Sequence, residues 1–286
     1  MRAQRISGSI AYHAEGPCWW AATGRLRFVD MLHGAVVEVD DDGDHRRLDV
    51  PSQVAAVIRP RLGGGAIVAT ESGIALGRAE DLSDLTEVVS LFDDPGIRNN
   101  EGHCDPAGRF WIGTMAYDQA EGAATVYRWD GPGHEPAVGW GDATVCNGLG
   151  FSPDHTLAYW NDTPTGQITV MDYDADRGPV DPRPLVRVQE GKGLPDGLWV
   201  DAEGGIWTAM NGGSAVHRYT PEGSLSEVVE LPVTQVTACT FGGENLDRLF
   251  ITTSRENLPD HAEPEAGSIY MVEPGVRGLA PLPFRG

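Results

Sequence analysis

Three segments of this chain place an oxygen-bearing side chain at one fixed distance before a tight turn. These side chains are Asn100, Asn147 and Asp196, and each stands five residues before the first residue of its turn. A glycine and a short apolar stretch lie between the side chain and the turn in each case. If the three segments belong to successive structural units around an axis, their amide and carboxylate groups are aimed at one point. Oxygen donors gathered in this way could bind a metal ion.

The first part of the chain supplies a fourth polar group, Glu15, which is also followed by a glycine. It precedes its turn glycine, Gly24, by nine residues, where Asn100 and Asp196 precede theirs by eight. Four oxygen ligands without Cys or His suit a hard divalent cation such as Ca²⁺ or Mg²⁺, with Mn²⁺, Zn²⁺ or Fe²⁺ tolerated. Because only two of the four are carboxylates, positions remain for water or substrate, which is typical of a catalytic metal site.

The elements that would position these groups repeat along the whole chain. Six short β-rich runs each follow a turn and begin roughly 40 to 48 residues apart, the period of four-stranded propeller blades. They cover residues 24–29, 65–69, 108–113, 156–160, 204–208 and 247–252. Most are followed by a second run with the alternation of a half-buried strand, at residues 34–40, 124–130, 166–172, 214–219 and 267–272.

Composition supports the same architecture. The 37 Gly and 20 Pro spread turn residues along the chain and leave no long helical pattern free of them. The sequence therefore predicts an all-β fold, a six-bladed β-propeller with four-stranded blades around a central channel. A propeller closes only when all its blades are present, so a single domain over residues 1–286 is expected.

The charge of the chain excludes several classes of partner. A net charge of −21 argues against nucleic acid and anionic membranes, because both need a basic surface to replace counterions. No run of about 18 apolar residues is present for a membrane span. The first residues lack the apolar core of a signal peptide, so a cytoplasmic location is expected. The oligomeric state stays open, and a monomer is compatible with the sequence.

Other catalytic chemistries find no support. The four cysteines show neither Cys-x-x-Cys nor zinc-finger spacing, and we expect small buried apolar residues rather than metal ligands or nucleophiles. Motifs of serine hydrolases, zinc proteases and nucleotide-binding proteins are absent from the sequence. Of the eight histidines only His13 and His103 lie near the recurrent signature, where a place in a pocket wall or on the surface is favoured over metal ligation. The tryptophans at strand positions are expected to pack between blades.

Taken together in order, several motifs resemble the senescence marker protein 30, gluconolactonase and luciferin-regenerating enzyme family. They are Glu15-Gly-Pro-x-Trp, Arg98-x-Asn-x-Gly with Asp105-Pro-Ala-Gly-Arg-Phe-Trp-Ile-Gly-Thr-Met, Asn147-Gly-Leu, Pro195-Asp-Gly, Thr237-x-Cys-x-Phe-Gly-Gly and Leu249-Phe-Ile-Thr-Thr. The match spans nearly the entire chain. The resemblance implies a six-bladed propeller with one divalent metal near the axis, and hydrolysis of sugar lactones.

Carried over residue by residue, the resemblance implies metal ligands at Glu15, Asn147 and Asp196. It implies that Asn100 is a fourth ligand or a substrate contact through water. The predicted substrate contacts are Arg98, Asn100, Glu101, His103 and Asp118. The chain departs from the family at two of them: many members have Asn-Asp-Gly at positions 100–102, and a glutamate that contacts substrate is here Asp118. The second departure bears on the identity of the sugar.

The implied chemistry leaves two roles open. Asp196 is the predicted general base, or a ligand only, with another group activating the water. Arg98 could orient substrate oxygens through its fork of donors, or form a salt bridge to Glu101 or a neighbouring acid. The favoured function is a metal-dependent lactonase, and the alternative is a non-enzymatic propeller that binds a divalent metal or a partner. A scaffold has no need of oxygen side chains beside an arginine at the axis, whereas a lactonase does.

Overall fold

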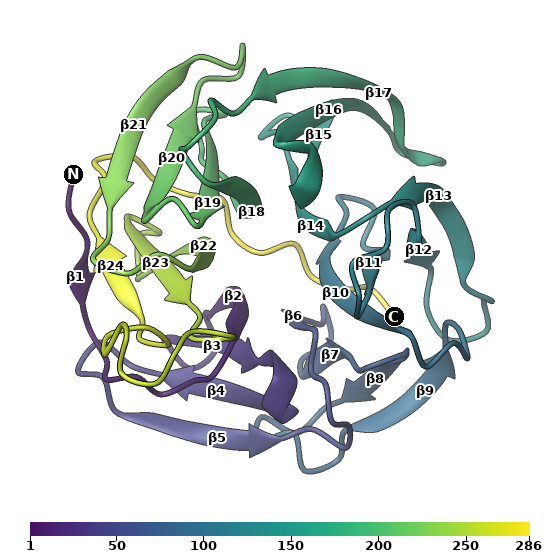
Figure 1. Cartoon of the computed structure of the whole chain (residues 1–286). Helices are drawn as coiled ribbons and strands as arrows, with labels where there is room; N and C mark the ends of the chain where they lie inside the picture. Colours follow the sequence, from purple (N-terminus) through teal and green to yellow (C-terminus); the bar gives the residue numbers. More distant parts are fainter.

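The computed structural model of the chain describes residues 1–286, and it confirms the six-bladed propeller. Twenty-four strands form six antiparallel sheets of four strands, arranged as blades around a central channel (Figure 1). The only helices are two 3-10 helices of three residues each, η1 (Met31–His33) and η2 (Thr163–Thr165). No helix is therefore long and apolar enough to cross a membrane.

Each of the first five blades is built from four consecutive strands, running from the channel outward. Blade one consists of β2 (Ala14–Trp20), β3 (Arg25–Asp30), β4 (Ala35–Val39) and β5 (His45–Asp49). Blade two consists of β6 (Val57–Pro60), β7 (Ala66–Ala69), β8 (Gly73–Gly77) and β9 (Thr86–Ser90). Blade three consists of β10 (Ile97–Cys104), β11 (Phe110–Ala116), β12 (Ala124–Trp129) and β13 (Ala137–Ala143). Blades four and five are β14 (Cys146–Phe151), β15 (Leu157–Asp162), β16 (Gln167–Asp174), β17 (Gly178–Arg187); and β18 (Leu194–Val200), β19 (Ile206–Asn211), β20 (Ala215–Tyr219), β21 (Leu225–Glu230).

The sixth blade joins the two ends of the chain. From the channel outward it is β22 (Val236–Gly242), β23 (Arg248–Thr253), β24 (Tyr270–Val272) and β1 (Gln4–Arg5). The N-terminal strand thus supplies the outermost position, antiparallel to β24. A ring closed in this way leaves no blade incomplete.

The six predicted β-rich runs are the second strands of the six blades, β3, β7, β11, β15, β19 and β23. The turns before three of them place Gly24, Gly108 and Gly204 in the left-handed region, with φ of 65°, 80° and 85°. Glycine adopts this conformation without the steric cost of a Cβ atom. The turn glycines and the repeat period of the sequence therefore predicted the positions of the second strands.

The core lies between the blades, because each sheet packs both faces against its neighbours. The innermost strand β22 is buried along its whole length, whereas four of the five residues of the outermost strand β5 are exposed. All four cysteines are free and buried, as predicted, and burial raises the pKa of the Cys18 thiol to about 11. Trp111 and Trp207 are also fully buried and donate their Nε1–H to Asp105 and Asp201 respectively, as expected for packing residues.

The C-terminal segment crosses one end of the channel (Figure 1). On one side of the ring, the Arg277 carbonyl accepts a hydrogen bond from Ala202 and the Leu279 carbonyl accepts one from the Trp199 indole. On the other side, Phe284 N–H donates to the Pro60 carbonyl at 2.8 Å. These bonds fix the segment across the end of the channel at which the inner strands finish.

Deleting residues 1–8 is expected to destabilise the whole ring. The deletion removes β1 and the backbone bonds that join Ala3 to Glu230 and Ile6 to Ile269. A third backbone bond, from Glu230 N–H to the Met1 carbonyl, is lost with them. At about 0.5–1.5 kcal/mol for each net hydrogen bond, these three bonds alone amount to about 1.5–4.5 kcal/mol. Thermal unfolding followed by circular dichroism measures the loss.

The matched control for this deletion is Arg2→Ala, which removes only an exposed ion pair to Glu230 and leaves the backbone bonds in place. Exposed pairs contribute about 0–1 kcal/mol, so this variant should melt close to the wild type. Equal melting temperatures for the deletion and Arg2→Ala would show that β1 does not hold the sixth blade.

Candidate functional site

The four predicted oxygen donors lie on the innermost strands of four blades: Glu15 on β2, Asn100 on β10, Asn147 on β14 and Asp196 on β18. All four stand near the beginning of their strand. Each strand has one extra residue relative to its neighbour at this place, a β-bulge. A bulge bends the strand and re-aims a side chain. β6 of blade two pairs without a bulge and supplies no oxygen donor.

Hydrogen bonds link blades three and four across the site. Arg98 Nη1 donates to Asn100 Oδ1 at 2.7 Å, and Asn100 Nδ2 donates to Asn147 Oδ1 at 2.8 Å. Asn100 Nδ2 also donates to the Cys146 carbonyl, and Asn147 Nδ2 donates to Thr163 Oγ1 at 2.6 Å. Because every amide nitrogen has an acceptor, both amide oxygens have a fixed orientation.

Asp196 has one oxygen held and one oxygen free. Asn211 Nδ2 donates to Oδ2 at 3.0 Å, whereas Oδ1 is buried without any hydrogen-bond partner. Burial raises the pKa of Asp196 to about 7, against the lowering effect of the Asn211 bond. Burial, followed by the charges of Asp196 and Glu101, raises the pKa of Glu15 well above its ordinary value. Neither carboxylate forms an ion pair with a Lys or Arg side chain, and only the neutral His13 ring lies near Glu15, with Nε2 3.8 Å from Oε1, so this place is short of positive charge.

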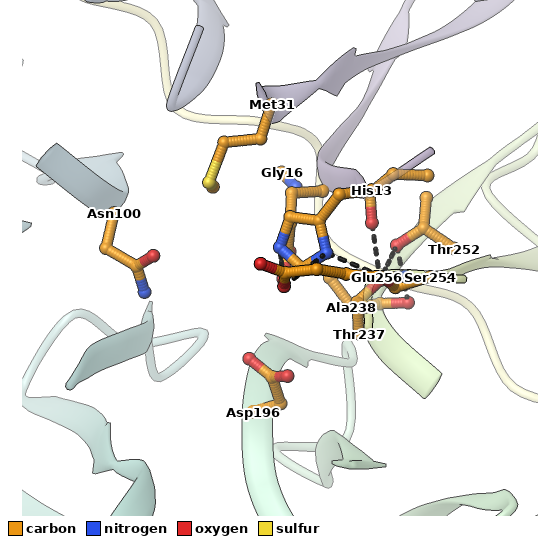
Figure 2. Close-up of polar contacts among 12 residues, drawn as sticks. His13, Gly16, Met31, Asn100, Asp196, Thr237, Ala238, Thr252, Ser254 and Glu256 are labelled. Atoms are coloured by element: carbon orange, nitrogen blue, oxygen red, sulfur yellow. Dashed lines mark hydrogen bonds and ion pairs between the residues drawn. The ribbon is translucent and has the colours of Figure 1, made fainter. Parts of the chain in front are cut away.

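Figure 2 shows the side chains of Met31, Asn100, Asp196 and Glu256 around a common space, with His13 on one side of it. His13 Nδ1 lies 2.7 Å from Ser254 Oγ, and burial lowers the pKa of its imidazole to about 3. The ring is therefore neutral and forms part of the wall. No group of three or more His, Cys, Asp or Glu side chains comes together as a metal site.

Arg98 is buried and forms no ion pair, so the predicted alternative of a salt bridge to Glu101 is not realised. Its Nη1 contacts Met31 Sδ at 3.0 Å, the Asn99 carbonyl and Asn100 Oδ1. Its Nε and Nη2 have no partner in the protein. The guanidinium carbon lies 5.9 Å from the centre of the Tyr117 ring. Burial lowers the pKa of Arg98. Two donors of a fixed guanidinium thus remain for a ligand.

Glu101 pairs with Arg59 of β6, at 3.0 Å between Oε1 and Nη2, and both residues are buried. Arg59 Nη1 also donates to the Gly16 carbonyl at 3.0 Å. Arg59 therefore joins the bulge that follows Glu15 to the bulge that follows Asn100. The one inner strand without a bulge holds its two neighbours at a fixed separation.

Arg59→Met is expected to cost about 3–5 kcal/mol of unfolding free energy, because it leaves Glu101 as a buried charge without a partner. The double variant Arg59→Met/Glu101→Gln removes that charge and should recover most of the loss. Denaturant unfolding measures both. Arg183→Met is the matched control, since its ion pair to Asp172 is exposed and contributes about 0–1 kcal/mol. A double variant no more stable than the single one would contradict this role of the pair.

Two predicted substrate contacts lie apart from the cluster. His103 stands near the end of β10 and packs against Trp199 and Phe151, with ring centres 5.1 and 6.1 Å away. It faces the opposite end of the channel. Asp118 is exposed on the loop that follows β11, next to Tyr117, and accepts a hydrogen bond from the Ala120 backbone. That loop follows the end of β11 that pairs with Arg98, so Asp118 lies at the rim of the site.

Several side chains of the site escaped the sequence analysis. Met31, Thr163 and Asn211 come from the ends of the second strands or from the turns that follow them. The sequence does contain a pattern that marks the first two. Both η1 and η2 directly follow an Asp, and a glycine, Gly34 or Gly166, stands four residues after that Asp. Arg59 is a charged residue inside an otherwise apolar inner strand, and this contrast also indicates a residue with a specific role.

Comparison with known proteins identifies the same family that the sequence motifs resemble. A family model, the SMP-30/Gluconolactonase/LRE-like region, matches residues 13–255. The chain is 32% identical over 281 residues to the Bacillus subtilis (strain 168) protein named "Putative sugar lactone lactonase YvrE", covering 95% of this chain and 94% of that protein.

Two solved structures are similar over nearly the full length. A luciferin-regenerating enzyme superposes with a TM-score of 0.90 at 26% identity, covering 99% of each chain. A regucalcin from Agrobacterium tumefaciens str. C58, described as a calcium-binding protein, superposes with a TM-score of 0.89 at 29% identity, covering 100% of this chain and 98% of that one. This chain therefore belongs to the SMP-30/gluconolactonase/LRE-like family.

Proposed function

We propose that this protein is a metal-dependent hydrolase that opens a sugar lactone, such as an aldonolactone, to its aldonic acid. The observation that supports it most is the cluster of Glu15, Asn100, Asn147 and Asp196 beside the unpaired guanidinium of Arg98. The relative named for sugar lactone lactonase activity and the family description favour the same reaction.

The residues of the cluster fit a divalent cation. Asp196 Oδ1 is a buried oxygen without a partner, and the pKa of Glu15 is raised by burial and by neighbouring carboxylates. A cation would satisfy the free oxygen and offset the repulsion. Glu15, Asn147 and Asp196 would hold it, with Asn100 as a fourth ligand or a substrate contact. Oxygen donors of this kind suit Ca²⁺, Mg²⁺ or Mn²⁺, with Zn²⁺ or Fe²⁺ tolerated. When bound, the ion supplies Lewis acidity toward a carbonyl oxygen.

The reaction adds water across the ester bond of the lactone. Hydroxyl joins the carbonyl carbon, and the ring oxygen leaves with a proton. In this proposal the Asp196 carboxylate, besides lying beside the cation, accepts the proton of the attacking water and returns it to the leaving oxygen. Asn211 holds the other oxygen of the carboxylate and so fixes its direction. A positioned base of this kind contributes typically about 10²- to 10⁴-fold.

Arg98 orients the substrate in this proposal. Its Nη1 is held by Met31, Asn99 and Asn100, which leaves Nε and Nη2 to bind lactone oxygens. Tyr117 and Asp118 lie on one rim loop, and the Tyr117 hydroxyl donates to Glu71 Oε1 at 2.6 Å. That bond joins the rim of blade three to the loop of blade two. The rim side chains would select among sugars.

A panel of aldonolactones, with proton release followed at near-neutral pH in the presence of a divalent ion, tests the activity. Hydrolysis of at least one lactone is expected. Arg98→Ala should raise KM if the arginine only holds substrate, and should lower kcat as well if it also stabilises charge in the transition state. Arg78→Ala, at an exposed position, is the control that should leave both constants unchanged. Metal binding without hydrolysis of any lactone would instead favour a non-enzymatic propeller.

A further inference from the structure

A second cavity lies at the other end of the channel, and the proposed lactonase site does not use it. Its volume is about 230 Å³. Its walls come from the ends of the inner strands, with His103, Phe151 and Trp199, and from the C-terminal segment, with Leu279 and Leu282. No Asp, Glu, Lys or Arg lines it, although the chain carries a net charge of −21.

One polar atom in the cavity wall has a defined hydrogen-bonding role. His103 Nδ1 lies 2.8 Å from the Cys104 carbonyl, which can only accept, so Nδ1 carries the proton. Nε2 is then an acceptor, and no protein group donates to it. Burial, reinforced by the nearby Arg59 charge, lowers the pKa of His103 to about 3. The ring therefore stays neutral and offers a single lone pair.

We propose that this cavity binds a small neutral aromatic molecule that carries one hydroxyl or N–H donor, such as a phenol. The aromatic rings of Phe151 and Trp199 supply flat apolar walls, and His103 Nε2 accepts the one hydrogen bond. A cavity of about 150 Å³ is known to hold benzene, so 230 Å³ accommodates one substituted ring.

Other ligand classes fit this cavity poorly. A carboxylate or an amine would bring a charge that no Asp, Glu, Lys or Arg of the wall neutralises, and the second wall histidine, His155, is exposed to solvent. A sugar lactone would leave several hydroxyl groups against Val200, Leu279 and Leu282 without partners. The site is therefore distinct from the lactone site in chemistry as well as in position, and it does not depend on the proposed activity.

Calorimetric titration of the metal-loaded protein with phenol, anisole and benzoate tests the proposal. Phenol should bind one to one and about three- to tenfold more tightly than anisole, which has similar size but no donor. Benzoate should bind at least roughly tenfold more weakly than phenol, because no Lys or Arg of the wall offsets its charge. Saturating lactone should leave phenol affinity unchanged, since the two ligands occupy opposite ends of the channel.

His103→Phe should make phenol and anisole bind equally, because it keeps a ring and removes the acceptor. The matched control is His134→Phe, in a loop away from the cavity, which should keep the wild-type preference for phenol. If His103→Phe fails to fold, a crystal of the wild-type protein soaked in phenol decides: the phenol oxygen should lie within hydrogen-bond distance of Nε2. Equal affinity for phenol and anisole in the wild type, or phenol bound elsewhere, would overturn the proposal.

Discussion

Dialysis against a chelator is expected to abolish lactone hydrolysis, and the addition of a divalent ion is expected to restore it. The expectation rests on the two buried carboxylates, Glu15 and Asp196, whose pKa values are raised by burial and which form no ion pair with a Lys or Arg side chain. Without a cation, the cluster lacks the Lewis acid of the proposed mechanism, and the carboxylates repel each other. The measurement is the hydrolysis rate of dialysed protein before and after metal is titrated back.

The same titration should depend on pH in a definite direction. Burial raises the pKa of Asp196 to about 7 when no metal is bound. At pH 6 this carboxyl is mostly protonated, and an incoming ion must displace the proton, whereas at pH 8 it is already ionised. Metal affinity should therefore be lower at pH 6 than at pH 8. Full activity of metal-free protein would reject the metal-dependent mechanism.

Asp196→Asn is expected to lower kcat by about 10²- to 10⁴-fold at saturating metal, if Asp196 is the general base. The substitution keeps the shape and one ligating oxygen but removes the charge and most of the basicity. A role as ligand only predicts weaker metal binding, with turnover recovering as the metal concentration rises. Steady-state kinetics at several metal concentrations separate the two roles.

Asp118→Asn makes the same chemical change at the exposed rim and serves as the control. It should act mainly on KM, because Asp118 has no place near the reacting atoms. Thermal unfolding of both variants checks that each is folded. Near-normal turnover of Asp196→Asn at saturating metal would exclude the general-base role and leave Asp196 as a ligand.

Sequence period predicted the fold because each blade repeats one turn and one second strand. The same period located Asn100, Asn147 and Asp196, since a group at a fixed distance before a turn returns to the same place in every blade. The first residues of the turns proved structural: Asp105 and Asp201 accept backbone hydrogen bonds that close them. Such local contacts are encoded within a few residues, and sequence alone reveals them.

His103 shows what the period does not reveal. It lies three residues after Asn100, but the bulge between Asn99 and Gly102 takes up one of them, so at about 3.3 Å per residue the two residues are roughly 7 Å apart along the channel. The two residues are neighbours in the sequence motif, but their positions along the strand place them at different depths of the channel. The roles of Arg59 and Asn211 could not be predicted for a related reason. Their partners, Glu101 and Asp196, lie 42 and 15 residues away in the sequence. Contacts between strands and between blades depend on the assembled ring rather than on local sequence.

The place of β1 in blade six has a consequence for synthesis of the chain. Blades one to five consist of contiguous residues and can form in order as the ribosome releases them. Gln4 and Arg5, however, pair with Met271 and Tyr270, which are made more than 260 residues later. At about 5–20 residues per second, the N-terminal segment must wait on the order of 10–50 s for its partner. Pairing over so large a sequence separation is slow, so docking of this segment should be the last step in closing the ring.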